Sequence, residues 1–228
     1  MQYAVVKQAV FLSRPNRFIA KVLLDGREET VHVKNTGRCR EILKPGVPVL
    51  LEAASNPSRK TQYSLIAVYK GERLINIDSQ VPNTAVYEAI QGNRLPPFTN
   101  CSVLKREVTF GSSRFDLYYD RDGVKGFIEV KGVTLEESDV AMFPDAPTER
   151  GAKHVYELVK AVEAGYEGNI LFLIQMKGTR RFVPNVAMDP AFAAALQTAC
   201  KSGVRILAWD SVITENGIEL GDEVEIQV

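Results

Sequence analysis

The segment GFIEVKGVT, residues 126–134, decides how this chain is interpreted. Its β-branched and aromatic residues, with glycines near both ends, predict a β-strand. Side chains alternate between the two faces of a strand, so Glu129 and Lys131 are expected on one face and Ile128 and Val130 on the other. Placing a carboxylate and an ammonium side by side in so apolar a strand is unfavourable unless the charges have a partner or a task.

The strand that precedes this segment carries another acidic residue. SRFDLYYD, residues 113–120, predicts a strand that a turn at Asp122-Gly123 joins to the first one, and Asp116 lies in its middle. Two adjacent strands therefore offer an Asp, a Glu and a Lys that converge. Two carboxylates suit Mg²⁺ or Mn²⁺, because these cations prefer oxygen ligands. Lys131 beside such a cation would orient an attacking water or stabilise charge on a phosphodiester.

The elements around this strand pair predict a mixed sheet flanked by helices. Their order is helix, three strands, helix, strand, helix and strand. The helices are NTAVYEAIQ (83–91), TERGAKHVYELVKAVEAGY (148–166) and PAFAAALQTACKSG (190–203). The additional strands are SVLKREVTF (102–110), NILFLIQM (169–176) and VRILAWD (204–210). The acidic tail after residue 210 predicts a small hairpin.

The first third of the chain predicts an all-β domain. Its expected strands are RFIAKVLL (17–24), REETVHV (27–33), PVLLEAAS (48–55), QYSLIAVYK (62–70) and RLINI (73–77). NTGRCREILKPG (35–46) predicts a short helix with Asn35 or Thr36 as its cap. This pattern favours an OB-like barrel, a fold that binds single-stranded nucleic acid or sugars. We therefore divide the chain into an OB-like domain at 1–80 and a mixed-sheet domain at 81–228.

Charge is distributed unevenly, although the net charge is zero. Residues 1–78 hold 13 lysines and arginines against 7 aspartates and glutamates, a balance of +6, and the remainder carries −6. This asymmetry indicates either a module that binds a polyanion or a chance distribution of surface charge. Under the first interpretation, the candidate contacts to nucleic-acid phosphates are Arg14, Arg17, Arg38, Arg40, Arg59 and Lys60.

Composition argues against several other kinds of site. The three cysteines are far apart and odd in number, so they predict neither a metal-binding spacing nor a disulfide framework. With two histidines, no G-x-S-x-G motif and no glycine-rich phosphate loop, we expect no histidine-rich metal site and no nucleotide-cofactor site. No apolar run approaches the roughly 20 residues of a membrane span, and the N-terminus does not resemble a signal peptide, so we expect a cytoplasmic protein.

Longer motifs resemble one protein family. FIEVKGVTLEE, FPDAPTERGAKHVYELVKAV, NTGRCREILKPG, SRFDLYY and DPAFAAALQTACKSGVRILAW resemble the sugar fermentation stimulation protein A family of bacteria and archaea. The resemblance covers nearly the whole chain. It implies an N-terminal OB-like domain, and a C-terminal domain like the PD-(D/E)xK nucleases whose pattern Asp116, Glu129 and Lys131 match. The proline that names that pattern is Phe115 here. The resemblance also implies DNA binding, a regulatory role in sugar (maltose) metabolism and nuclease activity on DNA or RNA.

Two further groups of polar residues are candidates for the same site. Nucleases of this kind often add an acidic residue from the helix before the three strands, where Glu88 lies; a solvated helical glutamate is the alternative. The next helix opens with Glu149, Arg150, Lys153 and His154, a polar cluster at a helix N-terminus, where phosphate is favoured. His154 is either a proton shuttle near neutral pH or a hydrogen-bonded structural residue.

We therefore expect a protein that binds nucleic acid non-specifically and hydrolyses phosphodiester bonds, with Mg²⁺ or Mn²⁺ held by Asp116, Glu129 and Glu88. The alternative is a non-catalytic DNA-binding regulator of sugar metabolism genes, because a fold does not guarantee an activity. A sugar-binding module is a third class, against which the basic balance of the barrel argues. The paired carboxylates favour the enzyme, because without a cation they would repel a polyanion.

Overall fold

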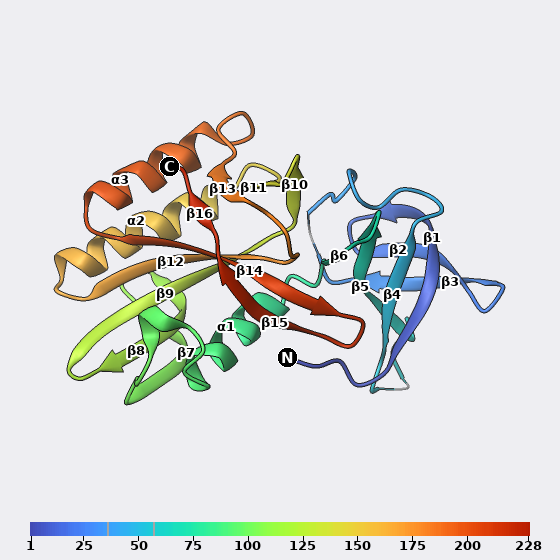
Figure 1. Ribbon diagram of the computed structural model, residues 1–228, viewed down its shortest axis with the longest axis horizontal. Coiled ribbons are helices and arrows are strands. Elements are labelled where there is room, and N and C mark those ends of the chain that lie inside the picture. The colour runs from blue at the N-terminus through green and yellow to red at the C-terminus, as the bar shows by residue number, and fades with distance from the viewer. Residues whose placement is uncertain (36, 57) are drawn as a thin grey trace.

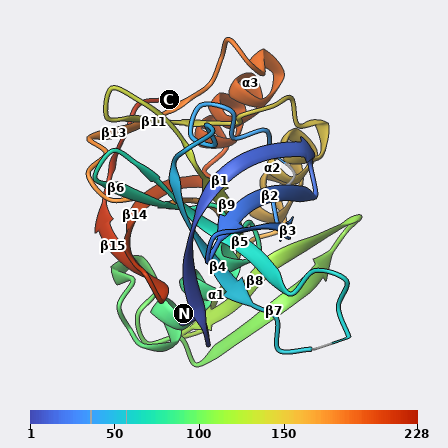
Figure 2. The same cartoon turned by 90° about the vertical axis from the view of Figure 1, so that its right-hand side faces the viewer.

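The computed structural model describes residues 1–35, 37–56 and 58–228. A β-barrel formed by the N-terminal part of the chain lies beside a larger sheet covered by helices (Figure 1). Viewed from the side, the barrel stands in front of that sheet (Figure 2). This architecture confirms the expected OB-like barrel followed by a mixed-sheet α/β domain.

Five strands close the barrel and a sixth extends it. They pair in the order β3-β2-β1-β4-β5-β6, and an additional β3–β5 pairing closes the ring. Their bounds are β1 (Val6–Asn16), β2 (Ile19–Leu24), β3 (Arg27–Val33), β4 (Pro48–Ala53), β5 (Tyr63–Lys70) and β6 (Arg73–Asn76). The β2–β3 turn has positive φ at Asp25 and Gly26, as the Asp-Gly pair predicts. β1 was not among the strands expected from the sequence.

The helix expected at residues 35–46 is wrong for the described part of that segment. In its place the chain makes one turn, in which Ile42 and Leu43 donate backbone hydrogen bonds to the Cys39 carbonyl. Cys39 has a φ of +48°, which ends any helical run. Cys39, Ile42 and Leu43 have the spacing of apolar residues on one face of a helix, but their side chains belong to the core that fills the barrel. Thr36, one of the two expected caps, lies outside the described residues.

The mixed sheet has the strand order β15-β14-β12-β9-β8-β7. β9, β12 and β14 run parallel, and the flanking pairs are antiparallel. The bounds are β7 (Val103–Phe110), β8 (Ser113–Arg121), β9 (Val124–Val133), β12 (Glu167–Ile174), β14 (Arg205–Thr214) and β15 (Gly217–Glu223). The expected meander is therefore confirmed, and β14 with β15 forms the hairpin expected in the acidic tail.

Helices cover both faces of this sheet, as Figure 1 shows. α1 (Val81–Gln91) packs on one face, where Val86 shares a core with Leu117 and Ile128. α2 (Glu149–Glu163) and α3 (Pro190–Lys201) pack on the other face, against Phe127 and Phe172. α2 begins where the Thr148 side chain accepts a hydrogen bond from the Gly151 amide, so its N-terminus is fixed by a cap.

A second, small sheet was not expected from the sequence. Its strands pair in the order β10-β11-β13-β16. They are β10 (Leu135–Glu137), β11 (Val140–Phe143), β13 (Arg181–Pro184) and β16 (Glu225–Ile226), and a short 3₁₀ helix, η1 (Pro96–Phe98), follows α1. Strands of two to four residues are too short to show an alternating pattern in the sequence.

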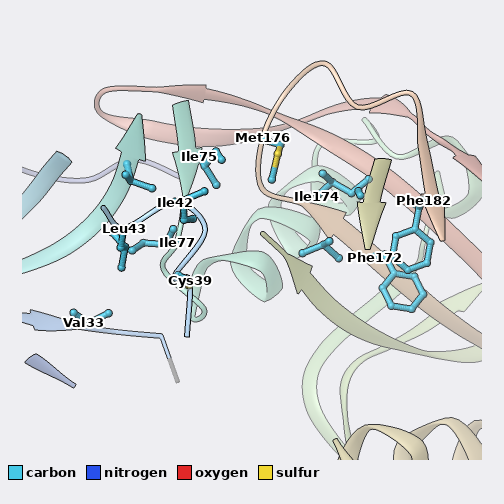
Figure 3. Packing of buried hydrophobic residues seen from close by; sticks show 14 of the residues in the cluster. Val33, Cys39, Ile42, Leu43, Ile75, Ile77, Phe172, Ile174, Met176 and Phe182 are labelled. Atoms are coloured by element: carbon cyan, nitrogen blue, oxygen red, sulfur yellow. The ribbon is translucent and has the colours of Figure 1, made fainter. Parts of the chain in front are cut away.

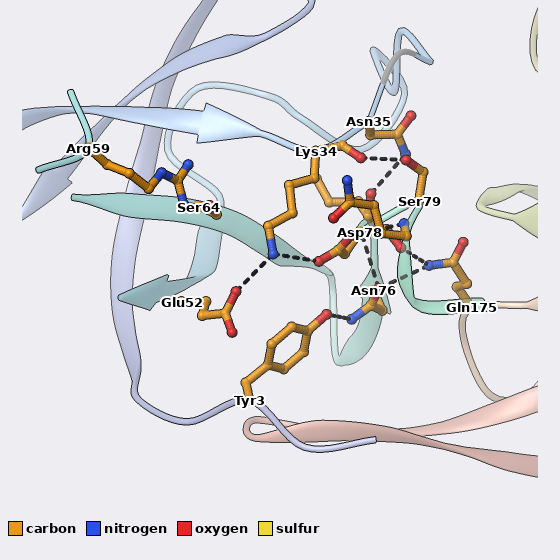
Figure 4. A network of polar contacts seen from close by, with 12 residues as sticks. Tyr3, Lys34, Asn35, Glu52, Arg59, Ser64, Asn76, Asp78, Ser79 and Gln175 are labelled. Carbon is orange, nitrogen blue, oxygen red and sulfur yellow. Dashed lines mark hydrogen bonds and ion pairs between the residues drawn. The ribbon is translucent and has the colours of Figure 1, made fainter. Parts of the chain in front are cut away.

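The barrel and the sheet share an apolar core. Figure 3 shows Val33 and Ile75 of the barrel in the same cluster as Ile174, the last residue of β12, and Met176, which follows that strand. A polar network continues this contact (Figure 4): the Gln175 side chain donates to Asn76 Oδ1 at 2.9 Å and to the Asp78 carbonyl at 3.1 Å. The segment that links barrel to sheet is therefore held at a fixed position beside β9 and β12.

Candidate active site

The Asp, Glu and Lys expected from the sequence meet in one pocket at the end of the β8–β9 ladder. The ladder stops at the pair Leu117 and Ile128, so Asp116 and Glu129 occupy the position where the next pair would stand. Asp116 Oδ2 instead accepts a 2.8 Å hydrogen bond from the Val130 amide, and its Oδ1 accepts one of 2.6 Å from the Asn83 side chain. The regular pairing of β8 and β9 thus ends at the position of the two carboxylates.

The pocket has a volume of about 240 Å³ and is strongly polar. Elements far apart in the sequence contribute to it: the segment before α1, α1 itself, β7, β8, β9 and α2. Its lining residues are Ser79, Asn83, Glu107, Arg114, Asp116, Glu129, Val130, Lys131, Arg150 and His154.

Glu129 is the most enclosed acidic group of the pocket, with 2% of the residue exposed. Its Oε1 atom lies 2.6 Å from the Lys131 ammonium and 2.5 Å from His154 Nδ1. Its Oε2 atom is buried and has no hydrogen-bond partner among the described residues. A buried carboxylate oxygen without a partner is unfavourable, so this atom is available to a ligand that enters the pocket.

The two carboxylates have opposite pKa shifts. Burial and the nearby charge of Glu129 raise the pKa of Asp116 to about 6. Burial also acts to raise the pKa of Glu129, but the hydrogen bond from His154 and the charge of Lys131 outweigh it and lower that pKa. Near neutral pH Glu129 is therefore firmly ionised, whereas Asp116 is close to its titration point.

His154 connects Glu129 to the first turn of α2. Arg150, one helical turn earlier, points its Nε–H towards His154 Nε2 at 3.5 Å. A donor facing Nε2 leaves the ring proton on Nδ1, which then donates to Glu129. His154 is 8% exposed. Of the four polar residues predicted here, Arg150 and His154 line the pocket, whereas Glu149 and Lys153 are exposed and do not.

Glu88 does not lie among the residues that line the pocket. It forms a 2.6 Å ion pair with the Met1 amino group. The α1 residue that contacts Asp116 is Asn83, and a position five residues later is rotated by about 140° around the helix axis. The structure therefore places Asn83, not Glu88, where a helix-borne ligand was expected.

Four side chains that line the pocket were missed by the sequence analysis: Ser79, Asn83, Glu107 and Arg114. Counting back from the turn at Gly111 pairs Arg106 with Leu117 and Val108 with Phe115, which places Glu107 opposite Asp116. Glu107 has a φ of +57° and an ion pair of 2.7 Å with Arg114. The hairpin register was readable in the sequence and could have identified this residue. No comparable signal marks Ser79 or Asn83.

The predicted phosphate-contact residues of the barrel divide into two groups. Arg14, Arg17, Arg38 and Arg40 line a single pocket of about 400 Å³. We call it the arginine pocket. Arg59 and Lys60 lie outside it, in the loop between β4 and β5, where Arg59 Nη1 is 3.5 Å from the Ser64 hydroxyl.

We call the pocket around Asp116 and Glu129 the carboxylate pocket. Its oxygen donors suit a cation that keeps much of its water. No group of three or more His, Cys, Asp or Glu side chains suited to hold a metal occurs among the described residues. Mg²⁺ commonly binds through only one or two carboxylates, with water and substrate phosphates completing its shell. Asp116 and the unpartnered Oε2 of Glu129 meet that requirement. Separately, no helix in the described ranges is long and apolar enough to cross a membrane.

Comparisons with known proteins agree over the full length of the chain. A family model described as "Sugar fermentation stimulation protein RE domain" matches residues 80–217, and one described as "SfsA N-terminal OB domain" matches residues 12–77. A sugar fermentation stimulation protein homolog of Alkaliphilus oremlandii is 60% identical, over 99% of this chain and 98% of its own. One of Desulfitobacterium hafniense strain Y51 is 54% identical, over 100% and 99%.

A solved structure is similar over the same extent. The structure of Pyrococcus furiosus SfsA in complex with Ca²⁺ superposes with a TM-score of 0.91 at 29% sequence identity. The match covers 100% of this chain and 98% of that one.

Proposed function

Because this chain belongs to the sugar fermentation stimulation protein family, we propose that it binds nucleic acid and hydrolyses its phosphodiester bonds with the help of a divalent cation. The observation that carries the proposal is the carboxylate pair of Asp116 and Glu129, with one buried Glu129 oxygen left without a partner. A pocket that opens two carboxylates towards a polyanion repels it unless a cation lies between them.

The Ca²⁺ in the related Pyrococcus structure supports a divalent cation as the ligand. In this chain, Asp116 and Glu129 would hold Mg²⁺ or Mn²⁺, which prefer such oxygen donors. A cation bound there supplies a water that deprotonates more readily and an electrostatic partner for the phosphoryl oxygens.

The remaining polar residues of the pocket lie where they could act on a phosphodiester during its hydrolysis. Lys131 presents an ammonium 2.6 Å from Glu129 Oε1, at a position suited to orient water or to stabilise a phosphorane-like transition state. Arg150, in the first turn of α2, adds a guanidinium where the helix N-terminus favours an anion. His154 fixes the orientation of Glu129 through its Nδ1 contact.

The barrel supplies the binding component. Four arginines gathered in one pocket are suited to phosphate groups, because guanidinium groups pair with them bidentately. DNA and RNA are both substrates that this chemistry would accept. A sugar-binding barrel is disfavoured, because neutral sugars do not need a concentration of positive charge.

A second candidate is a non-catalytic DNA-binding regulator of sugar metabolism genes. The arginine pocket favours it, since the carboxylate residues do not line that pocket and nucleic acid could bind there without being cut. The two candidates differ in whether the carboxylate pocket does chemistry.

The test is cleavage of end-labelled single- and double-stranded DNA and RNA in Mg²⁺, Mn²⁺ or EDTA, with wild type, Glu129→Gln and Lys131→Ala. We expect cutting that requires the cation, and its loss in both variants with binding retained. Glu88→Gln is the matched control, an acid-to-amide change on α1 outside the pocket. Binding without cutting in every cation, or cutting that survives both substitutions, would leave the regulator as the better account.

A further inference from the structure

The arginine pocket combines four guanidinium groups that have no ion-pair partner among the described residues. No salt bridge in residues 1–35, 37–56 and 58–228 involves Arg14, Arg17, Arg38 or Arg40. Arg17, Arg38 and Arg40 are exposed, whereas Arg14 is half-buried. Collecting like charges around one cavity is unfavourable in itself, so the pocket is built for an anion.

Arg14 holds the walls of the pocket together. Its guanidinium donates to the backbone carbonyls of Arg17, Asn35 and Arg38, at 2.8, 2.6 and 2.8 Å. These bonds fix the β1–β2 turn against the segment after β3. The backbone positions of Arg17 and Arg38 are thus set before any ligand binds, which lowers the entropy lost on binding.

The third wall comes from the domain that carries the carboxylates. Ala146, in the loop before α2, lines the arginine pocket, and Arg150, four residues later, lines the carboxylate pocket. Four residues span at most about 14 Å.

A second connection between the two pockets runs through Ser79 and the segment after β3. Ser79 lines the carboxylate pocket and donates a 2.5 Å hydrogen bond to the Lys34 carbonyl, as seen in Figure 4. The next residue, Asn35, gives its carbonyl to Arg14 in the arginine pocket. Both pockets therefore border the same two segments, one from each domain.

We propose that the arginine pocket binds the terminal phosphate of a nucleic-acid strand, whose following nucleotides run to Asp116 and Glu129. This inference rests on the proposed function and identifies the kind of strand on which the site acts. The pocket is walled by the β1–β2 turn, the 37–43 loop and the loop before α2, so a strand end that enters it brings its terminal phosphate between guanidinium groups on several sides.

A strand end matches the charge of the pocket with about two phosphates, where a continuous strand would need about three. The Asp145 carboxylate packs against Gly37 at the wall and offsets one of the four positive charges. A terminal monoester carries about −1.5 to −2 near pH 7. A neighbouring diester adds one further negative charge, so the two together balance the net positive charge of the pocket.

The test measures binding, not cleavage, so that it stands apart from the test of the proposed function. Oligonucleotides of one sequence, labelled internally, carry a 5′-phosphate, a 3′-phosphate or hydroxyls at both ends. Their affinities for the Glu129→Gln protein are measured in EDTA by fluorescence anisotropy at fixed salt. We expect one phosphorylated end to bind at least about tenfold more tightly, the effect of a charged hydrogen bond.

Variants locate the effect. Arg17→Ala combined with Arg40→Ala should abolish the preference for the phosphorylated end, because it removes two of the four guanidinium groups of the pocket. The fold should be retained, since these exposed side chains make no structural hydrogen bond in the described residues. Arg27→Ala, an exposed barrel arginine outside the pocket, should retain it. Arg14 is left intact because it holds the backbone.

Three results would overturn the inference. They are equal affinity for all three ends, a preference that survives the double substitution, and competition by inorganic phosphate as strong as by the phosphorylated strand. Cleavage without any preference for an end would refute this inference alone and leave the proposed function in place. End-specific binding without cleavage would refute the proposed function and leave this inference in place.

Discussion

Replacing Asp116 by asparagine should stabilise the cation-free protein, although it removes a residue of the candidate active site. Asp116 has a pKa of about 6 in the folded protein, against 3.8 as the ordinary value. The folded state therefore holds this proton more tightly than the unfolded chain does. Stability falls as the pH rises from the lower to the higher pKa, because the unfolded chain releases the proton first.

The difference between the two pKa values sets the magnitude. The difference of about 2 between these pKa values corresponds to about 3 kcal/mol lost from the free energy of unfolding well above pH 6. At pH 5 about half of this loss has developed, so the advantage of the variant should grow by about 1–2 kcal/mol between pH 5 and pH 8. Asparagine can keep both hydrogen bonds, accepting from Val130 and donating to Asn83 once that amide rotates.

The assay is chemical or thermal denaturation of wild type and Asp116→Asn in EDTA at several pH values. For a chain of this length the pH-dependent part of the advantage amounts to about 3–6 °C in Tm. Asp120→Asn, on the same strand outside the pocket, controls for the substitution itself. An advantage that does not change with pH, or a variant less stable than wild type at pH 8, would refute the reasoning.

Three further predictions concern single positions. Gly132→Ala should destabilise the protein by about 1–3 kcal/mol in chemical denaturation, because the new methyl group meets the Gln175 amide oxygen and lies 2.7 Å from Pro82 Cγ; unchanged stability would contradict this packing. Glu88→Gln should change stability by less than about 1 kcal/mol, since it removes an ion pair that is 41% exposed on the Glu88 side, and should not affect cation binding measured by calorimetry. His154→Ala should raise the pKa of Glu129, followed by its ¹³C carboxyl shift, because a hydrogen bond that lowers it is lost; an unchanged titration would show that Lys131 alone sets this pKa.

The central elements were predictable because their patterns are local. β8 and β9 are joined by a turn whose Asp122 and Gly123 both have positive φ, which the Asp-Gly pair signals. That turn fixes the register, and the register brings Asp116 and Glu129 together. The buried strand β12 and the capped helix α3 followed from an equally local signal.

The parts that were missed depend on contacts between distant segments. β11 is a strand because it pairs with β13, about 40 residues later, and neither has a pattern of its own. The turn at Cys39 is set by the barrel interior that its neighbours fill. Glu88 and Asn83 are equivalent candidates in a helical pattern, and only the packing of α1 determines which of them faces Asp116.

The hydrogen bond from the Val130 amide to Asp116 has a spectroscopic consequence. Most amides of a central strand donate a hydrogen bond to a backbone carbonyl of the neighbouring strand, whereas the Val130 amide donates to a titrating carboxylate at 2.8 Å. Protonation of Asp116 or a cation bound to it would change the electron density at that oxygen, and with it the ¹⁵N and ¹H shifts of Val130. The backbone thus contains a native reporter of the pocket, readable in ¹⁵N-enriched protein without a substrate, a dye or a substitution.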